Sequence, residues 1–115
     1  MDYQKIVRVN LRLKKPVTIR LIIRKDRSGA VADYRPSYNA ECKLRGHLIR
    51  VYMQTIHDFP GRHIPQLIIH ELIHAKQEES GGDDRDHGKK FRRIARRLSA
   101  LYNLPGIYVP GLDYP

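Results

Sequence analysis

The order of apolar and polar residues divides the chain into a first half that favours strands and a second half that favours helices. Residues 5–13 alternate apolar and polar side chains for most of their length, which predicts a half-buried strand, although a short helix also fits. Pro16 ends this element. Residues 17–24 are apolar and β-branched, and they predict a buried strand that ends near Asp26.

Residues 31–53 have the pattern of a β-meander. Turn-forming residues interrupt the apolar pattern at residues 34–39 and at Arg45-Gly46, where we expect breaks. The last strand is expected over Leu48 to Met53. The first half is therefore predicted to contain strands.

A helix is predicted to begin near Pro65. Proline suits the first turn of a helix, because its missing N–H would have no intrahelical partner there. The helix is expected to continue to about Glu79 and to stop at Gly81-Gly82.

A second helix is expected over residues 87–102, where Asp84 or Asp86 can cap its first turn. Apolar residues at helical spacing predict a packed face made of Phe91, Ile94, Ala95, Leu98 and Leu101. The remaining surface is cationic and consists of Lys89, Lys90, Arg92, Arg93, Arg96 and Arg97. Residues 103–115 contain three prolines and two glycines, which predicts an irregular tail that packs through Ile107, Tyr108, Val109 and Leu112.

This order of elements predicts a single α+β domain over residues 1–115, a length typical of one domain. The longest mostly apolar run, residues 64–75, is interrupted by polar side chains and is too short for a membrane span. No secretory signal pattern is present at the N-terminus. We therefore expect a cytoplasmic protein without a membrane partner.

Charge and cysteine content narrow the class of partner. Lys and Arg number 22 against 12 Asp and Glu, for a net charge of +10, which favours a polyanion such as DNA. A generally solvated basic surface explains the charge equally well. Cys42 is the only cysteine, which excludes an intrachain disulfide and a cysteine-based zinc ribbon, and we expect it to be a small buried hydrophobic residue.

Candidate chemistry lies in the first predicted helix, at His70-Glu71-Leu72-Ile73-His74. On a helix, His70 and His74 project from one face one turn apart, so both imidazoles can bind one metal ion. Glu71 lies beside them, where its carboxylate can act on a water molecule as a general base. Zinc is the expected metal. Polar residues without a ligand are the alternative, but burial among apolar neighbours such as Ile69 and Leu72 would then be costly.

The third ligand is expected to be His87. No Glu follows Glu79, and an extended HExxHxxGxxH motif fails because Gln77 and Ser80 occupy its Gly and His positions. His87 is the only later histidine, and Gly88 beside it allows close approach of the backbone. The competing oxygen ligands are Asp83, Asp84 and Asp86, and His87 can instead be a surface residue near the helix cap. A surface or supporting role is expected for Glu78, and no metal role for His47, His57 or His63.

The HELxH motif, followed by His87-Gly88-Lys89-Lys90-Phe91 in the form HGxxF, resembles the SprT-like metalloproteases, a zincin family that includes the DNA-dependent proteases called Spartan. The resemblance covers mainly residues 64–101. It implies that His87 is the third zinc ligand. It also implies a small, mostly antiparallel sheet over the motif helix, with substrate antiparallel to an edge strand, for which Leu48 to Met53 is the candidate.

The family's activity implies cleavage of proteins attached to or crosslinked with DNA. The leading hypothesis is therefore a zinc endopeptidase with one Zn²⁺ per chain and a protein or peptide substrate. Its DNA contacts would come from the basic residues of the second helix, although a solvated helix face is the alternative. The second hypothesis is a basic DNA-binding protein in which zinc is mainly structural and proteolysis is weak. In a third hypothesis, residues 106–115 fold over the cleft and inhibit the enzyme.

Overall fold

The computed structural model describes residues 1–24, 30–58, 63–81 and 87–109, with the backbone alone for residues 56–58. Its helices and strands are α1 (Tyr3–Lys5), the π-helix η1 (Ile6–Asn10), β1 (Val17–Ile22), β2 (Ala32–Tyr38), β3 (Leu44–Tyr52), α2 (Met53–Asp58), α3 (Ile64–Glu79) and α4 (Lys89–Tyr102). The α+β class expected from the sequence is confirmed. None of the helices in the described ranges is both long and apolar enough to cross a membrane.

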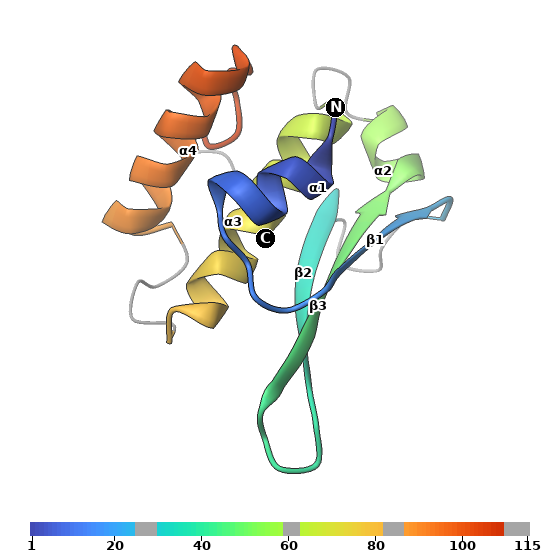
Figure 1. Cartoon of the computed structure of the whole chain (residues 1–115). Coiled ribbons are helices and arrows are strands. Elements are labelled where there is room, and N and C mark those ends of the chain that lie inside the picture. Colours follow the sequence, from blue (N-terminus) through green and yellow to red (C-terminus); the bar gives the residue numbers. More distant parts are fainter. Residues whose placement is uncertain (25–29, 59–62, 82–86, 110–115) are drawn as a thin grey trace.

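The described strands form a mixed sheet in the order β1-β3-β2 (Figure 1). β1 pairs with β3 in parallel, with Val17 opposite His47, whereas β2 pairs with β3 antiparallel, with Ala32 opposite Val51. The expected mostly antiparallel sheet is therefore wrong, because one of its two strand pairs is parallel. The expected edge strand over Leu48 to Met53 is also wrong, since β3 is hydrogen-bonded on both sides.

Three expectations for the first half differ from the structure. Of the two alternatives for residues 5–13, the strand is wrong and the short helix is confirmed, since this segment forms the end of α1 and η1; the N–H of Leu11 donates to the carbonyl of Ile6 at 2.9 Å, the hydrogen bond of a π-helix. β2 continues through the break expected at residues 34–39, because Pro36 lies on an edge strand, where a missing N–H is tolerated. α2 begins at Met53, where the sequence predicted a strand end.

Gly46 lies inside β3 instead of forming a turn. The N–H of its neighbour His47 donates to the carbonyl of Pro16 at 2.9 Å, and a Cβ at Gly46 would lie 3.1 Å from that same oxygen. Glycine is therefore used here for the close approach of two backbones.

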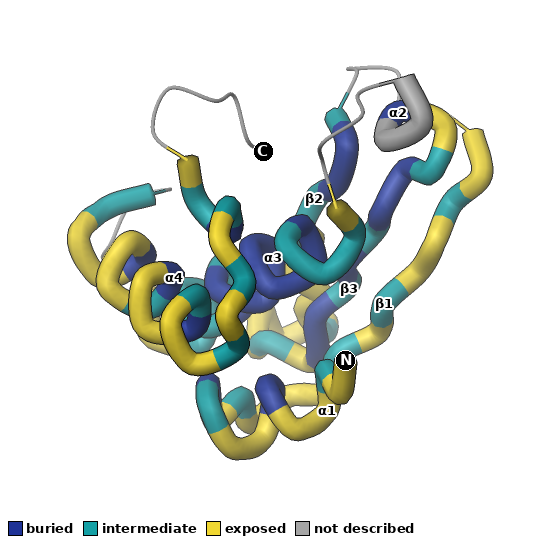
Figure 2. The backbone as a smooth tube through the Cα atoms, turned by 90° about the horizontal axis from the view of Figure 1, so that it is seen from above, coloured by how far each residue is buried: buried dark blue, intermediate teal, exposed yellow. Residues whose placement is uncertain are grey.

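α3 is the buried centre of the molecule. In Figure 2 it lies between the sheet and α4, with the N-terminal helices along a third side. Its buried residues are Leu67, Ile68, Ile69, His70, Glu71, Leu72, Ile73 and Ala75. The prediction for its bounds is confirmed, with Pro65 in the first turn and Gly81 just after the end at a φ of +92°.

α4 packs on α3 through Phe91, Ala95 and Leu98, which are buried. Leu101, expected on the packed face, is 59% exposed, so this part of the prediction is wrong. The expected capping residues Asp84 and Asp86 lie outside the described residues, and Gly88 is the residue that precedes the helix. Beyond Asn103 the described chain has no further helix or strand up to Val109, and Ile107 is buried there.

Candidate metal centre

Three histidines meet where α3 packs against the start of α4. His70 and His74 project from α3 one turn apart, and His87 lies two residues before Lys89, the first residue of α4. One ring nitrogen from each histidine lies within 4.8 Å of the others, so the three can hold one metal ion. Nε2 of His70 and Nε2 of His87 are 3.0 Å apart.

Phe91 forms the apolar base of this cluster. Its ring centroid lies 4.9 Å from that of His70, 4.7 Å from that of His74 and 4.8 Å from that of His87. The side chain is fully buried in the contact between α3 and α4. Phe91 therefore fixes the position of all three imidazoles through packing, and it excludes water from one side of the cluster.

Hydrogen bonds to the outer nitrogens set the tautomers of the two α3 histidines. Nδ1 of His70 lies 2.7 Å from the carbonyl oxygen of Ile107, and Nδ1 of His74 lies 2.7 Å from Oε1 of Gln77. Both oxygens can only accept, so both Nδ1 atoms carry the proton. In the neutral rings, Nε2 then keeps its lone pair for a metal.

The chain after α4 completes the wall around the cluster. Gln66 in the first turn of α3 donates to the carbonyl of Pro105. Gly106 follows at a φ of +88°, which allows the turn that brings Ile107 to His70. The ring of Tyr108 stacks on that of His87 at a centroid distance of 5.1 Å. Residues far apart in sequence thus hold the imidazoles in place.

Glu71 is next to His70 in sequence and is 1% exposed. Among the described residues, no hydrogen-bond partner is found for its buried Oε2. Burial, and then the negative charge of Asp33 on β2, hold the pKa of the Glu71 carboxyl well above its ordinary value. A buried carboxyl with an open oxygen, on the residue that follows His70, has the chemistry that a catalytic base requires.

Several other candidates lie away from this cluster or cannot be placed. Cys42 is exposed at a turn with a φ of +62°, so its expected burial is wrong. Glu78 is half-buried and His63 is exposed. The competing ligands Asp83, Asp84 and Asp86 fall outside the described residues, as does the side chain of His57. The six basic residues of α4 are all exposed.

His47 belongs to a second, partly buried polar group that includes Tyr34 and Glu79. Its Nδ1 lies 2.7 Å from the hydroxyl oxygen of Tyr34, and its Nε2 lies 2.6 Å from Oε2 of Glu79. Glu79 also accepts from the backbone N–H groups of Lys14 and Lys15 at 2.7 and 3.0 Å. This group joins β3, the C-terminal turn of α3 and the N-terminal segment.

Sequence reasoning missed two residues that orient the histidines. Gln77 follows His74 by three positions, and residues at this spacing are neighbours on a helix, so the contact had a sequence signal. The contact of the Ile107 carbonyl with His70 had no sequence signal, because every residue carries a backbone carbonyl and the sequence does not show which one lies near the ring.

Comparison with known proteins gives one match. The model of the SprT-like family matches residues 7–109 of the chain, which include the histidine cluster and all of the sheet. No curated protein and no solved structure matches.

Proposed function

The chain belongs to the SprT-like family, and we propose that it is a zinc-dependent endopeptidase that cleaves proteins attached to DNA. The observation that carries the catalytic part is the convergence of His70, His74 and His87, together with the buried carboxyl of Glu71, the residue after His70. Membership in this family supports a function of the metalloprotease type.

Zinc fits the donor set. Three neutral imidazoles and an open fourth position are typical of catalytic zinc sites. Two nitrogens on one tetrahedral zinc ion lie about 3.3 Å apart when each bond is about 2.0–2.1 Å. The 3.0 Å between the Nε2 atoms of His70 and His87 is close to this value. When bound, zinc would supply a Lewis acid and would lower the pKa of water toward neutrality.

In this proposal Glu71 moves the protons. Its carboxylate accepts a proton from the attacking water and then delivers that proton to the nitrogen of the leaving amine. Burial favours the first step, because a carboxylate shielded from water binds a proton more readily than one in solvent. His70, His74 and His87 hold the metal, and Phe91 keeps their rings in place.

A substrate chain is expected to bind along an exposed strand edge. β3 is the central strand of the described sheet, which leaves β1 and β2 as edges. β2 carries Asp33, whose charge acts on Glu71, so we favour β2 as the strand nearer the reacting groups. Backbone hydrogen bonds to an edge strand would bind peptides with little dependence on their side chains.

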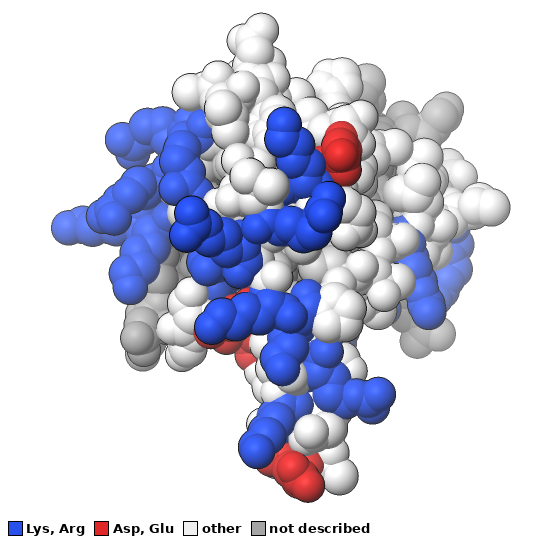
Figure 3. All heavy atoms as spheres, viewed as in Figure 1, with Lys and Arg blue, Asp and Glu red and all other residues white. Residues whose placement is uncertain are grey.

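The DNA part of the proposal is supported by charge. The net charge is +10, and Figure 3 shows Lys and Arg gathered over α4, the N-terminal helices and the β2–β3 hairpin. Such a surface attracts the phosphate backbone without regard to base sequence. A protein bound to DNA would thereby be brought to the enzyme.

The test is a proteolysis assay on a DNA-binding protein, with and without single-stranded DNA. Glu71→Gln keeps the size of the side chain but removes the base, so it should retain zinc and lose cleavage by about 10²–10⁴-fold. Glu78→Gln removes the same charge from the same helix and is expected to cleave normally. Equal activity of Glu71→Gln and the wild type would refute the mechanism. Zinc binding without any cleavage by the wild type would favour the alternative, a DNA-binding protein with weak or no proteolysis.

A further inference from the structure

The basic residues of α4 do not form one continuous face. The buried residues Phe91, Ala95 and Leu98 face α3, and the cations lie on the two flanks of this buried strip. Lys90, Arg93 and Arg97 follow one flank, where they line a hollow shared with α3. Arg92 and Arg96 follow the other flank, where they line a hollow beside Tyr108. The two flanks of α4 can therefore bind different ligands.

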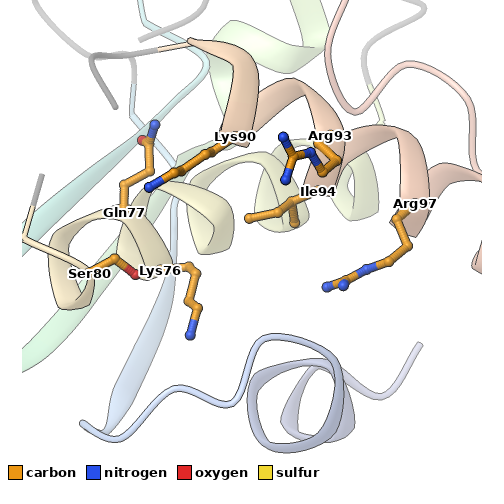
Figure 4. Close-up of a pocket in the computed structure, with 7 residues that line it drawn as sticks. All are labelled: Lys76, Gln77, Ser80, Lys90, Arg93, Ile94 and Arg97. Atoms are coloured by element: carbon orange, nitrogen blue, oxygen red, sulfur yellow. The ribbon is translucent and has the colours of Figure 1, made fainter. Parts of the chain in front are cut away.

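The hollow between α3 and α4 has a volume of about 280 Å³. Figure 4 shows the side chains of both helices around it, with Ile94 between the two basic residues Arg93 and Arg97. α3 contributes Lys76, together with the amide of Gln77 and the hydroxyl of Ser80. Among the residues that the structure describes, the lining thus combines four cations from two helices, two neutral hydrogen-bonding groups and one apolar residue, with no carboxylate.

This hollow continues toward the N-terminal segment. A neighbouring hollow is lined by Arg12 and Asn10 and shares Lys76, Ile94 and Arg97 with the first. Nη2 of Arg97 donates to the carbonyl of Asn10 at 3.1 Å, which holds this guanidinium at the junction. The cations therefore follow a path from the start of α4 to the segment after η1. A linear polyanion fits such a path better than a single small anion does.

The opposite flank of α4 lacks this convergence. Both cations that line its hollow, Arg92 and Arg96, come from α4 itself. On the α3 side, by contrast, cations from three separate chain segments meet in the two hollows that share Arg97. Bringing so many like charges together raises the free energy of the unbound protein, and a bound polyanion relieves this repulsion.

We propose that the groove lined by Lys76, Lys90, Arg93 and Arg97 binds the phosphodiester backbone of a nucleic-acid strand. Guanidinium groups pair with phosphate oxygens in a fork geometry, and lysine supplies further charge. Ile94 offers an apolar contact for the sugars. This site rests on the nucleic-acid part of the proposed function and is independent of catalysis.

The groove is joined to the histidine cluster by a single side chain. Gln77 lines the hollow, and its Oε1 accepts from Nδ1 of His74 at 2.7 Å. A strand in the groove would lie one residue away from the metal centre, on the far side of α3 from the sheet. A protein attached to that strand would then be held close to the reacting groups.

The experiment measures binding of a fluorescent single-stranded oligonucleotide to the full chain by anisotropy over a series of salt concentrations. Arg93→Gln with Arg97→Gln should weaken binding at least tenfold and reduce the slope of log K against log salt by about 1.4, at about 0.7 per lost phosphate contact. The matched control, Arg92→Gln with Arg96→Gln, removes the same charge from the same helix. It should change the affinity less than threefold, and an equal loss in both pairs would overturn the site.

A second pair of variants tests the contribution of α3. Lys76→Gln should weaken binding severalfold, whereas Arg20→Gln on the exposed face of β1 should not. If Arg97→Gln perturbs folding by losing its bond to Asn10, Arg93→Gln alone keeps that bond and should still reduce the salt slope. Competition gives a further check. If polyglutamate of equal charge displaces the bound oligonucleotide as well as a second oligonucleotide does, the proposal is refuted, because the groove would then have no preference for phosphate. Cleavage of a free peptide is expected to be unchanged in Arg93→Gln, which separates this test from that of catalysis.

Discussion

The carbonyl oxygen of Ile107 accepts a hydrogen bond from Nδ1 of His70 at 2.7 Å. The segment after α4 therefore orients a residue of the motif helix, and Tyr108 adds its stack on His87. This bears on the hypothesis that residues 106–115 inhibit the enzyme. Ile107 and Tyr108 belong to the wall of the histidine cluster, so their removal would damage the site whether or not the later residues are inhibitory.

Two truncations separate these roles. Ending the chain after Asn103 removes both supporting residues and should lower zinc affinity by about 10–100-fold, the usual effect of losing a group that orients a ligand. Ending it after Val109 keeps them and should leave zinc affinity unchanged. Competition with a chelating dye measures both. If only the chain that ends after Val109 cleaves peptide faster than the full chain does, residues 110–115 are inhibitory. If the two truncated chains bind zinc with identical affinity, the role of Ile107 is contradicted.

Gln77 is expected to control the affinity of the metal site. Gln77→Leu removes the acceptor for Nδ1 of His74, which frees the ring to change tautomer, so zinc affinity should fall by about 10–100-fold. Gln77→Glu keeps an acceptor at the same position and should retain the affinity. The same dye competition measures both variants. If zinc affinity falls equally in both variants, the amide of Gln77 acts through packing alone.

Because of Glu79, the stability of the folded protein should depend on pH in the acid range. Although burial raises the pKa of this carboxyl, hydrogen bonds from the backbone of Lys14, from His47 and from the backbone of Lys15 outweigh it and lower the pKa. The unfolded chain then binds the proton at a higher pH than the folded chain. Stability from Glu79 is therefore complete above the ordinary pKa and is lost as the pH falls through the folded value.

Glu79→Gln should remove this part of the pH dependence and lower the free energy of unfolding at neutral pH by about 1–3 kcal/mol. Urea denaturation between about pH 3 and pH 7 measures it. Glu78→Gln provides the control, since it removes the same charge from the preceding position. A pH profile for Glu79→Gln that parallels the wild type would show that another carboxyl is responsible.

Phe91 is predicted to be the most sensitive position of α4. Phe91→Ala leaves a cavity under three imidazoles and should lower the free energy of unfolding by about 3–5 kcal/mol. Leu101→Ala on the same helix changes an exposed side chain and should stay within about 0.5 kcal/mol. Chemical denaturation measures the free energy of unfolding of both variants. Similar losses of stability in the two would contradict the packing of Phe91 against the three histidines.

Local signals explain what could be predicted from the sequence. The bounds of α3 follow from Pro65 and Gly81, and the pairing of His70 with His74 follows from helix geometry alone. The approach of His87 needed elimination and a family resemblance, because the intervening loop carries no directional signal. The bounds of α3 and the pairing of its two histidines thus depend on residues close together in the chain, whereas the position of His87 does not.

Contacts between distant segments explain most of the errors. Ile6 and Val7 are buried on η1, and Leu11 is buried directly after it, yet the polar residues among them imitate strand alternation. Gly46 resembled a turn residue, but Pro16, the residue just before β1, approaches it closely. The parallel pairing of β1 with β3 has no sequence signature either, since the alternation of side chains is the same for both directions.

The contacts of Asn10 have a consequence for the order of folding. Its carbonyl accepts from Arg97 and its side chain from Tyr102, partners that lie 87 and 92 positions later in the chain. The N-terminal helices can therefore reach their native position only after α4 has been synthesised. Because the ends of so long a loop must be brought together, we expect this docking to be a late and slow step. Until then, the surface of α3 that these helices cover is accessible to chaperones on the ribosome.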